Sequence, residues 1–160
     1  MLFRQMRIRM TQRVRRTFIA RVKANFPCEA LGYMIGRTDE NYTLQVEEIF
    51  FPHDLDAACT PSQVNVKHSW LRHARRRARQ LKAIVLGDIH SHPYTQEELA
   101  RYKISPDCSP SEGDLARSSL GLVAGICLVK QGVDGKLRTR IKFWGPMVPV
   151  SEVVGKAPSC

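Results

Sequence analysis

Two segments of the chain have hydrophobic residues at helical spacing. In residues 11–25, basic residues surround an apolar helical face that comprises Val14, Phe18, Ile19 and Val22. Residues 69–81 are rich in alanine and arginine, and their apolar stripe comprises Trp70, Leu71, Ala74, Ala78 and Leu81. Both patterns predict surface helices that bury one face against a core.

Other segments show the alternation or the short apolar runs that are typical of strands. They are residues 6–10, 30–36, 42–51, 83–90, 123–130 and 137–144. Turn-forming residues at 39–41 and 132–135 should join two antiparallel pairs, and residues 54–61 are predicted to form a loop. The continuous apolar start of residues 83–90 indicates a central strand, buried on both faces, which carries two histidines to its end.

A third helical signal lies in the second half of the chain. Thr95 and Glu98 have the spacing of a capping box, which predicts one or two helical turns through Tyr102, followed by a loop with two prolines. A further helix should start at Ser111. We therefore interpret residues 94–110 as a helical insertion.

Together the elements predict an α/β protein of the α+β type, with a central mixed sheet flanked by helices. The length of 160 residues, 43% of them hydrophobic, suits a single core. We expect one domain over residues 1–150 and a C-terminal tail over residues 151–160.

Charge and cysteine content bear on partners and compartment. The formal net charge is +10, and basic residues are concentrated in residues 4–16 and 72–82. Such runs are typical of solvated faces or of surfaces for an anionic partner, and an acidic protein is favoured over nucleic acid. Five cysteines without a C-x-x-C pair indicate reduced thiols. No apolar run approaches the roughly 18 residues of a membrane span, so we expect a soluble, cytoplasmic protein without a membrane partner.

The sequence Gly-Asp-Ile-His-Ser-His-Pro at residues 87–93 carries the first chemical signal. Side chains two positions apart on a strand project to the same face, so His90 and His92 can contact one metal ion. A catalytic zinc site uses three protein ligands and leaves a fourth position to water. The alternative is a pair of surface histidines after a strand.

A third ligand is available in Ser111-Glu-Gly-Asp114, because a helix that starts at Ser111 would hold Asp114 rigidly in its first turn. The alternative is an ordinary helix N-cap with an acid at its third position. Hydrolysis also needs a group that moves protons. Glu29, just before a buried strand, is the candidate, and the alternative is a solvent-facing turn acid.

These separated elements, in this order, resemble the JAMM metalloproteases, also called MPN-plus or JAB domains. Their signature is an upstream glutamate, then His-x-His-Pro, then Ser-x-x-Asp, and the resemblance spans residues 6–146. It implies that His90, His92 and Asp114 bind one zinc ion per chain. It also implies that Glu29 is the general base and later acid, and that Ser111 helps to stabilise the oxyanion.

The resemblance implies hydrolysis of a peptide or isopeptide bond after the C-terminal tail of a ubiquitin-like protein, with that tail held along a strand edge. Small stand-alone bacterial and archaeal members of the family resemble this chain in size, and some of them act beside ubiquitin-like conjugation or sulfur-carrier systems, including antiphage defence operons. Leu31 departs from the cysteine that the family often has there. Residues 94–110 are longer than the family's usual link, so we hypothesise a lid that sets specificity, against a passive surface insertion.

A different class of function stays open at this point. Non-catalytic relatives retain the fold and serve as binding modules, and this chain's basic surface could dock nucleic acid or a protein assembly. Such a module has no chemical need for Glu29, both histidines, Ser111 and Asp114 together. Genomic neighbours would help to identify the substrate.

Overall fold

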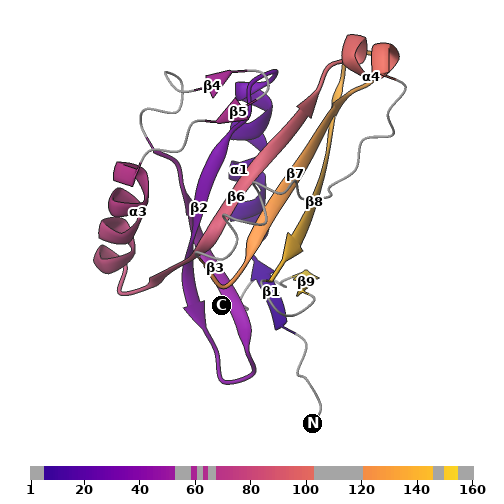
Figure 1. Ribbon diagram of the computed structural model, residues 1–160. Helices are drawn as coiled ribbons and strands as arrows, with labels where there is room; N and C mark the ends of the chain where they lie inside the picture. The colour runs from indigo at the N-terminus through magenta and orange to yellow at the C-terminus, as the bar shows by residue number, and fades with distance from the viewer. Residues whose placement is uncertain are drawn as a thin grey trace.

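The computed structural model describes residues 6–52, 59–60, 63–64, 68–102, 121–145 and 150–154. Its main feature is a seven-stranded mixed sheet with the strand order β8-β7-β6-β2-β3-β1-β9 (Figure 1). The predicted fold class, a mixed sheet flanked by helices, is confirmed. No helix within the described ranges is long and apolar enough to span a membrane.

The elements follow the chain in this order: β1 Met6–Met10, α1 Gln12–Asn25, β2 Leu31–Thr38, β3 Thr43–Phe50, β4 Cys59–Thr60, β5 Gln63–Val64, α3 His68–Gln80, β6 Ile84–Tyr94, α4 Gln96–Tyr102, β7 Ala124–Gln131, β8 Leu137–Trp144 and β9 Val150–Val154. The two predicted hairpins, β2–β3 and β7–β8, are both antiparallel. The pairs β6–β7, β1–β3 and β1–β9 are parallel.

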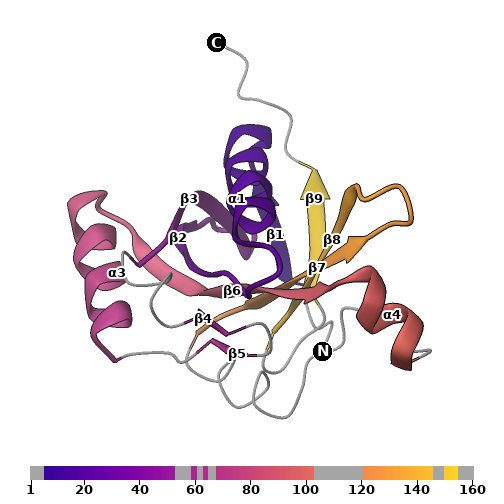
Figure 2. The same ribbon diagram turned by 90° about the horizontal axis from the view of Figure 1, so that it is seen from above.

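Helix α1 packs on one face of the sheet. It begins after Thr11, whose hydroxyl accepts a hydrogen bond from the backbone N–H of Val14 at 3.2 Å. Its buried residues Val14, Phe18 and Val22 join a core cluster with residues from β1, β2, β3, β6, β7 and β8. Figures 1 and 2 together show α1 on one side of β6, and the core cluster lies between this helix and the sheet.

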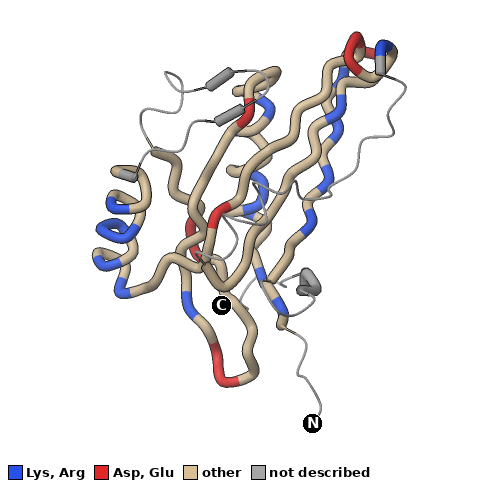
Figure 3. The backbone as a smooth tube through the Cα atoms, in the orientation of Figure 1, with Lys and Arg blue, Asp and Glu red and all other residues tan. Residues whose placement is uncertain are grey.

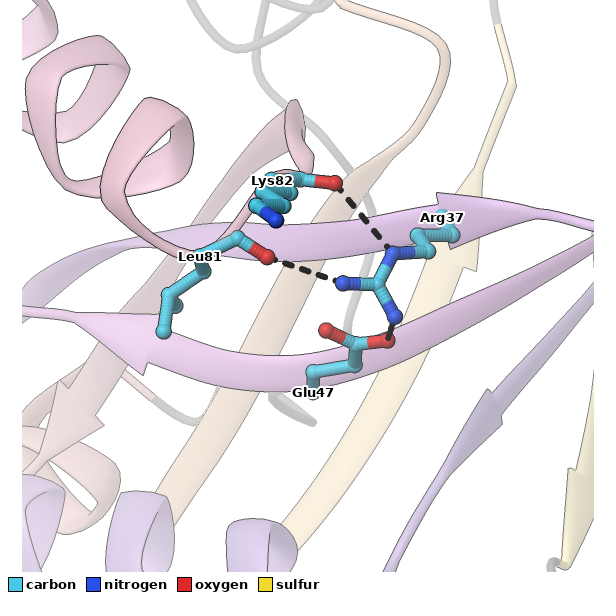
Figure 4. Close-up of polar contacts among 4 residues, drawn as sticks. All are labelled: Arg37, Glu47, Leu81 and Lys82. Atoms are coloured by element: carbon cyan, nitrogen blue, oxygen red, sulfur yellow. Dashed lines mark hydrogen bonds and ion pairs between the residues drawn. The ribbon is translucent and has the colours of Figure 1, made fainter.

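Helix α3 covers part of the opposite face. Trp70 and Ala74 pack with Leu31 and Tyr33 of β2 in a second, separate cluster. The C-terminal end of α3 is held by Arg37 of β2, whose guanidinium donates hydrogen bonds to the carbonyl oxygens of residues 81 and 82 (Figure 4). A cation at this end also complements the helix dipole.

Three boundaries differ from the sequence predictions. The expected loop at residues 54–61 contains β4, which pairs with β5; strands of two residues are too short to leave an alternating pattern. Strand β6 does not end with its histidines but continues through Pro93 to Tyr94. The expected tail at residues 151–160 begins inside β9, because β1 supplies a parallel partner that is distant in sequence.

Pro93 is tolerated within β6 because of its position. The register of β2 with β6 runs only as far as His90, whereas β7 pairs with β6 up to Tyr94. Proline removes a backbone donor and is therefore found where a strand has a partner on one side. The last residues of β6 thus pair with β7 alone among the described strands.

Candidate metal centre

The two histidines of β6 lie on the face of the sheet that α3 partly covers. His90 pairs with Leu31 of β2, and residues directly opposite one another in a sheet project to the same side. Leu31 belongs to the cluster under α3, which fixes the side on which both imidazoles lie. The side chain of His90 is 2% exposed and that of His92 is half-buried.

The ring nitrogens of these histidines are close enough to share an ion. His90 Nε2 and His92 Nε2 are 3.1 Å apart. Two nitrogens bound to one tetrahedral zinc ion at about 2.05 Å would lie about 3.3 Å apart. The pair therefore fits zinc with a shift of a few tenths of an ångström. The same separation also suits a hydrogen bond between two neutral imidazoles, in which one Nε2 donates to the other.

Asp88 lies two residues before His90 on the same strand and face. Its Oδ2 atom is 3.9 Å from His90 Nδ1, beyond hydrogen-bond distance but within the range of an ion pair. A carboxylate beside Nδ1 favours the tautomer whose proton is on Nδ1. That tautomer leaves the Nε2 lone pair for a metal, which is the common arrangement around histidine ligands.

The backbone holds the segment that contains Glu29 beside the part of β6 that carries the histidines. In the antiparallel register of β2 with β6, Leu31 pairs with His90 and Gly32 with Ile89, so one residue back along β2 corresponds to one residue forward along β6. Continued by two residues, this register would pair Glu29 with His92, and both side chains would then project from the same face. The side chain of Glu29 is half-buried.

Two hydrogen bonds between Ala30 and Ser91 extend the contact of these segments by one residue beyond Leu31 and His90. The backbone N–H of Ser91 donates to the carbonyl oxygen of Ala30 at 2.9 Å, and the N–H of Ala30 donates to the Ser91 hydroxyl at 2.8 Å. Ser91 is 1% exposed, so these bonds lie in the protein interior. The residue before Ala30 is thereby held beside the histidine strand.

Apolar residues flank the histidines on both sides. Leu31, Tyr33 and Trp70 lie toward α3, and Ile126 and Leu128 of β7 lie on the other side in register with His90 and His92. Low-polarity surroundings strengthen electrostatic interactions at a bound ion. The arrangement suits a metal that polarises a substrate carbonyl.

The remaining predicted site residues, Ser111 and Asp114, lie outside the described residues. Within the described ranges, no cluster of three or more histidine, cysteine or carboxylate side chains is arranged to hold a metal ion. The structure thus brings together His90, His92 and the Glu29 segment, and the third ligand stays a prediction. Sequence reasoning missed Asp88 and Ser91. The two-residue period of the strand could have identified Asp88, whereas the partner of Ser91 is 61 residues away.

Comparison with known proteins locates the chain among its relatives. The sequence profile described as "Prokaryotic homologs of the JAB domain" matches residues 11–98, more than half of the chain. This stretch includes Glu29, His90 and His92. A search of curated proteins found no match.

Similar solved structures include the solution structure of protein DSY2949 from Desulfitobacterium hafniense. It has a TM-score of 0.59 and 20% identity, covering 92% of this chain and 94% of that one. A crystal structure of AF2198, a JAB1/MPN domain protein from Archaeoglobus fulgidus, has a TM-score of 0.47 and 20% identity, covering 92% and 98%. At 20% identity, the similarity to DSY2949 bears on the fold alone. By its profile match, the chain belongs to the prokaryotic homologues of the JAB domain.

Proposed function

We propose that this chain is a zinc-dependent peptidase or isopeptidase that hydrolyses the bond after the C-terminal tail of a ubiquitin-like protein. The observation that carries the proposal is the pair of imidazole nitrogens 3.1 Å apart. The Glu29 segment is held beside them by the hydrogen bond from the Ala30 N–H to the Ser91 hydroxyl. His90, His92 and Asp114 would hold the ion. Membership of the JAB family, which includes metalloproteases, supports this chemistry.

A zinc ion at this position would supply a Lewis acid that activates water and polarises the scissile carbonyl. Glu29 would take the proton from the attacking water and then deliver it to the leaving amine. The half-buried side chain of Glu29, which directly precedes Ala30 beside β6, supports this role. Ser111 would donate a hydrogen bond to the carbonyl oxygen as that oxygen gains charge.

An extended substrate tail would have a strand to bind. Beyond His92, the residues Pro93 and Tyr94 of β6 are paired with β7 on one side, and no described strand pairs with them on the other. A polypeptide added to the open side would form main-chain hydrogen bonds independent of its side chains. The bond to be cleaved would then lie beside His92.

The test measures zinc content and turnover separately. The probes are ubiquitin-like proteins joined at the C-terminal carboxyl to a fluorogenic amine. We expect Glu29→Gln to keep about one zinc per chain and to lose turnover at least 100-fold, because general acid–base catalysis contributes about 10²–10⁴-fold. Asp114→Ala should lose both zinc and turnover. Glu40→Gln, an exposed glutamate in the β2–β3 turn, is the matched control and should resemble wild type.

The rival function is a non-catalytic binding module, and one observation favours it. The outer surface of α3 carries four exposed arginines, and the helix contains no acid: Arg72, Arg75, Arg76 and Arg79. If the chain is such a module, Glu29→Gln changes no measured property, and binding to DNA weakens steeply as salt is raised. Zinc-dependent turnover that vanishes in Glu29→Gln would exclude it.

A further inference from the structure

A row of cations lies beside the candidate metal centre, on two strands where the sequence shows no long basic run. Strands β7 and β8 contain no acidic residue. Four of their side chains are exposed and basic, and we call them the basic strip: Lys130, Arg138, Arg140 and Lys142. Figure 3 shows Lys and Arg gathered along β8, separate from the group on α3.

The register places the basic strip on the same face as the histidines. His90 pairs with Ile126, which pairs with Lys142; His92 pairs with Leu128, which pairs with Arg140. The next row pairs Tyr94 with Lys130, and Lys130 with Arg138. Contacts of Tyr94 and Trp144 with Ile126 and Leu128 confirm that these rows share one side of the sheet.

The rows of His90 and His92 therefore run from the centre, across an apolar residue of β7, to a cation of β8. Adjacent strands are about 4.8 Å apart, so the cations of β8 lie about 10 Å from the histidine strand. This distance is a few residues of extended polypeptide. A protein that presents its tail to the centre would rest its neighbouring surface on the basic strip.

The positive charge of the basic strip is only partly compensated. Asp134 forms two hydrogen bonds with Arg138, at 2.9 and 3.2 Å. Neither Lys130 nor Lys142 has an ionic partner among the described residues. Arg138, Arg140 and Lys142 are alternate residues of β8. Their Cα atoms are about 6.7 Å apart from one to the next, less than the Debye length of about 8 Å at physiological salt, so their positive charges repel one another.

We propose that the basic strip is the docking surface for an acidic face of the protein substrate, next to the scissile tail. This inference rests on the proposed hydrolase function, because only that function makes the neighbouring centre a site for protein tails. Carboxylates on the substrate would relieve the repulsion within the strip and orient the tail toward His92. A simpler explanation is that the cations prevent edge-to-edge pairing of β8.

The test compares two charge reversals of equal size. Arg140→Glu/Lys142→Glu alters the basic strip, and Arg75→Glu/Arg79→Glu alters the exposed face of α3 as the matched control. Both lower the net charge from +10 to +6. The probe is a fluorescent peptide of alternating glutamate and glycine, and binding is measured by anisotropy with the full chain. A peptide with glutamine in place of glutamate is the uncharged reference.

We expect the strip variant to bind the glutamate peptide roughly tenfold more weakly than wild type, and the control variant to bind it within about twofold. Wild-type binding should weaken as salt rises, and the glutamine peptide should not bind. Equal losses in both variants, or none in the strip variant, overturn the proposal. The proposal is also overturned if an oligonucleotide of matched charge binds more tightly than the peptide and loses affinity only in the strip variant.

The binding experiment needs no turnover, so its outcome is separate from that of the hydrolase proposal. In the cleavage assay, the strip variant should raise KM for an acidic substrate and leave kcat unchanged, because a docking contact contributes equally to ground state and transition state. Loss of kcat with unchanged KM would contradict docking. Retained zinc in the strip variant shows that the centre itself is intact.

Discussion

The two faces of the sheet are built differently from the same strands. Toward α1, alternate residues of β2 and β6, such as Met34 and Ile89, enter one continuous apolar cluster. Toward α3, the apolar residues fall into two smaller clusters, and Asp88, His90 and His92 lie between them. A single strand thus contributes to a core on one side and to a polar centre on the other.

The α1 face therefore contributes mainly to stability, whereas the α3 face carries the polar groups of the candidate metal centre. Buried hydrocarbon on the α1 face contributes to folding in proportion to its area. On the α3 face, polar groups interrupt the apolar surface, so less hydrocarbon contributes to folding there. This is common where side chains are held for function. Substitutions on the α1 face should therefore mainly change the free energy of unfolding, and substitutions at the polar centre on the α3 face should mainly change the proposed activity.

The largest effect on stability is expected on the α1 face. Phe18 is fully buried and stacks on Phe51, with ring centroids 6.1 Å apart. Phe18→Ala should lower the free energy of unfolding by about 3–5 kcal/mol, because it removes packed aromatic surface and leaves a cavity. Urea unfolding measures this loss. The exposed Lys142→Ala on the opposite face is the control and should change it by less than about 0.5 kcal/mol. Similar losses of unfolding free energy in both variants would contradict the proposed difference between the two faces.

An intermediate effect is expected at Ser91, because this residue is buried in the protein interior and also lies between the two histidines of β6. Ser91→Ala removes the acceptor of the Ala30 N–H and should cost about 1–3 kcal/mol. Because that bond holds the Glu29 segment, kcat should fall while zinc content is kept. Ser91→Thr retains the hydroxyl and should recover more kcat than alanine does. Unchanged kcat in Ser91→Ala would show that Glu29 is positioned by other contacts.

The smallest effect is expected at the β7–β8 turn. Hydrogen bonds from the Arg138 guanidinium, and then from the backbone N–H of Lys136, hold the pKa of Asp134 below its ordinary value of 3.8. The ionised form thus contributes stability above that value, and the contribution is lost as pH falls through the lower pKa of the folded state.

The difference in unfolding free energy between wild type and Asp134→Asn should therefore be small at neutral pH and should narrow further in acid. Chemical unfolding at pH 7 and near pH 3 measures it. A difference that widens toward acid would contradict the assigned hydrogen bonds. Both residues are exposed, so the effect stays well below that of Phe18→Ala.

The hydrophobic pattern of the sequence was enough to locate most elements and to divide their residues between core and solvent. The stripe of Val14, Phe18 and Val22 is buried as predicted, and the Thr95 capping box begins α4, where the N–H of Glu98 donates to the Thr95 hydroxyl. These features are local, because side chains within one or two turns make the contacts that define them. The same holds for the spacing that puts His90 and His92 on one face.

Tertiary structure alone decided which distant segments meet. The register of β2 with β6 pairs Leu31 with His90, and the hydrogen bonds between Ala30 and Ser91 hold the Glu29 segment beside the histidine strand, although no local period relates these residues. The pairing of β9 with β1 and the alignment of the basic strip with the histidines arise in the same way. A strand's pattern specifies its buried face but leaves its neighbour and register open, and long-range packing determines both.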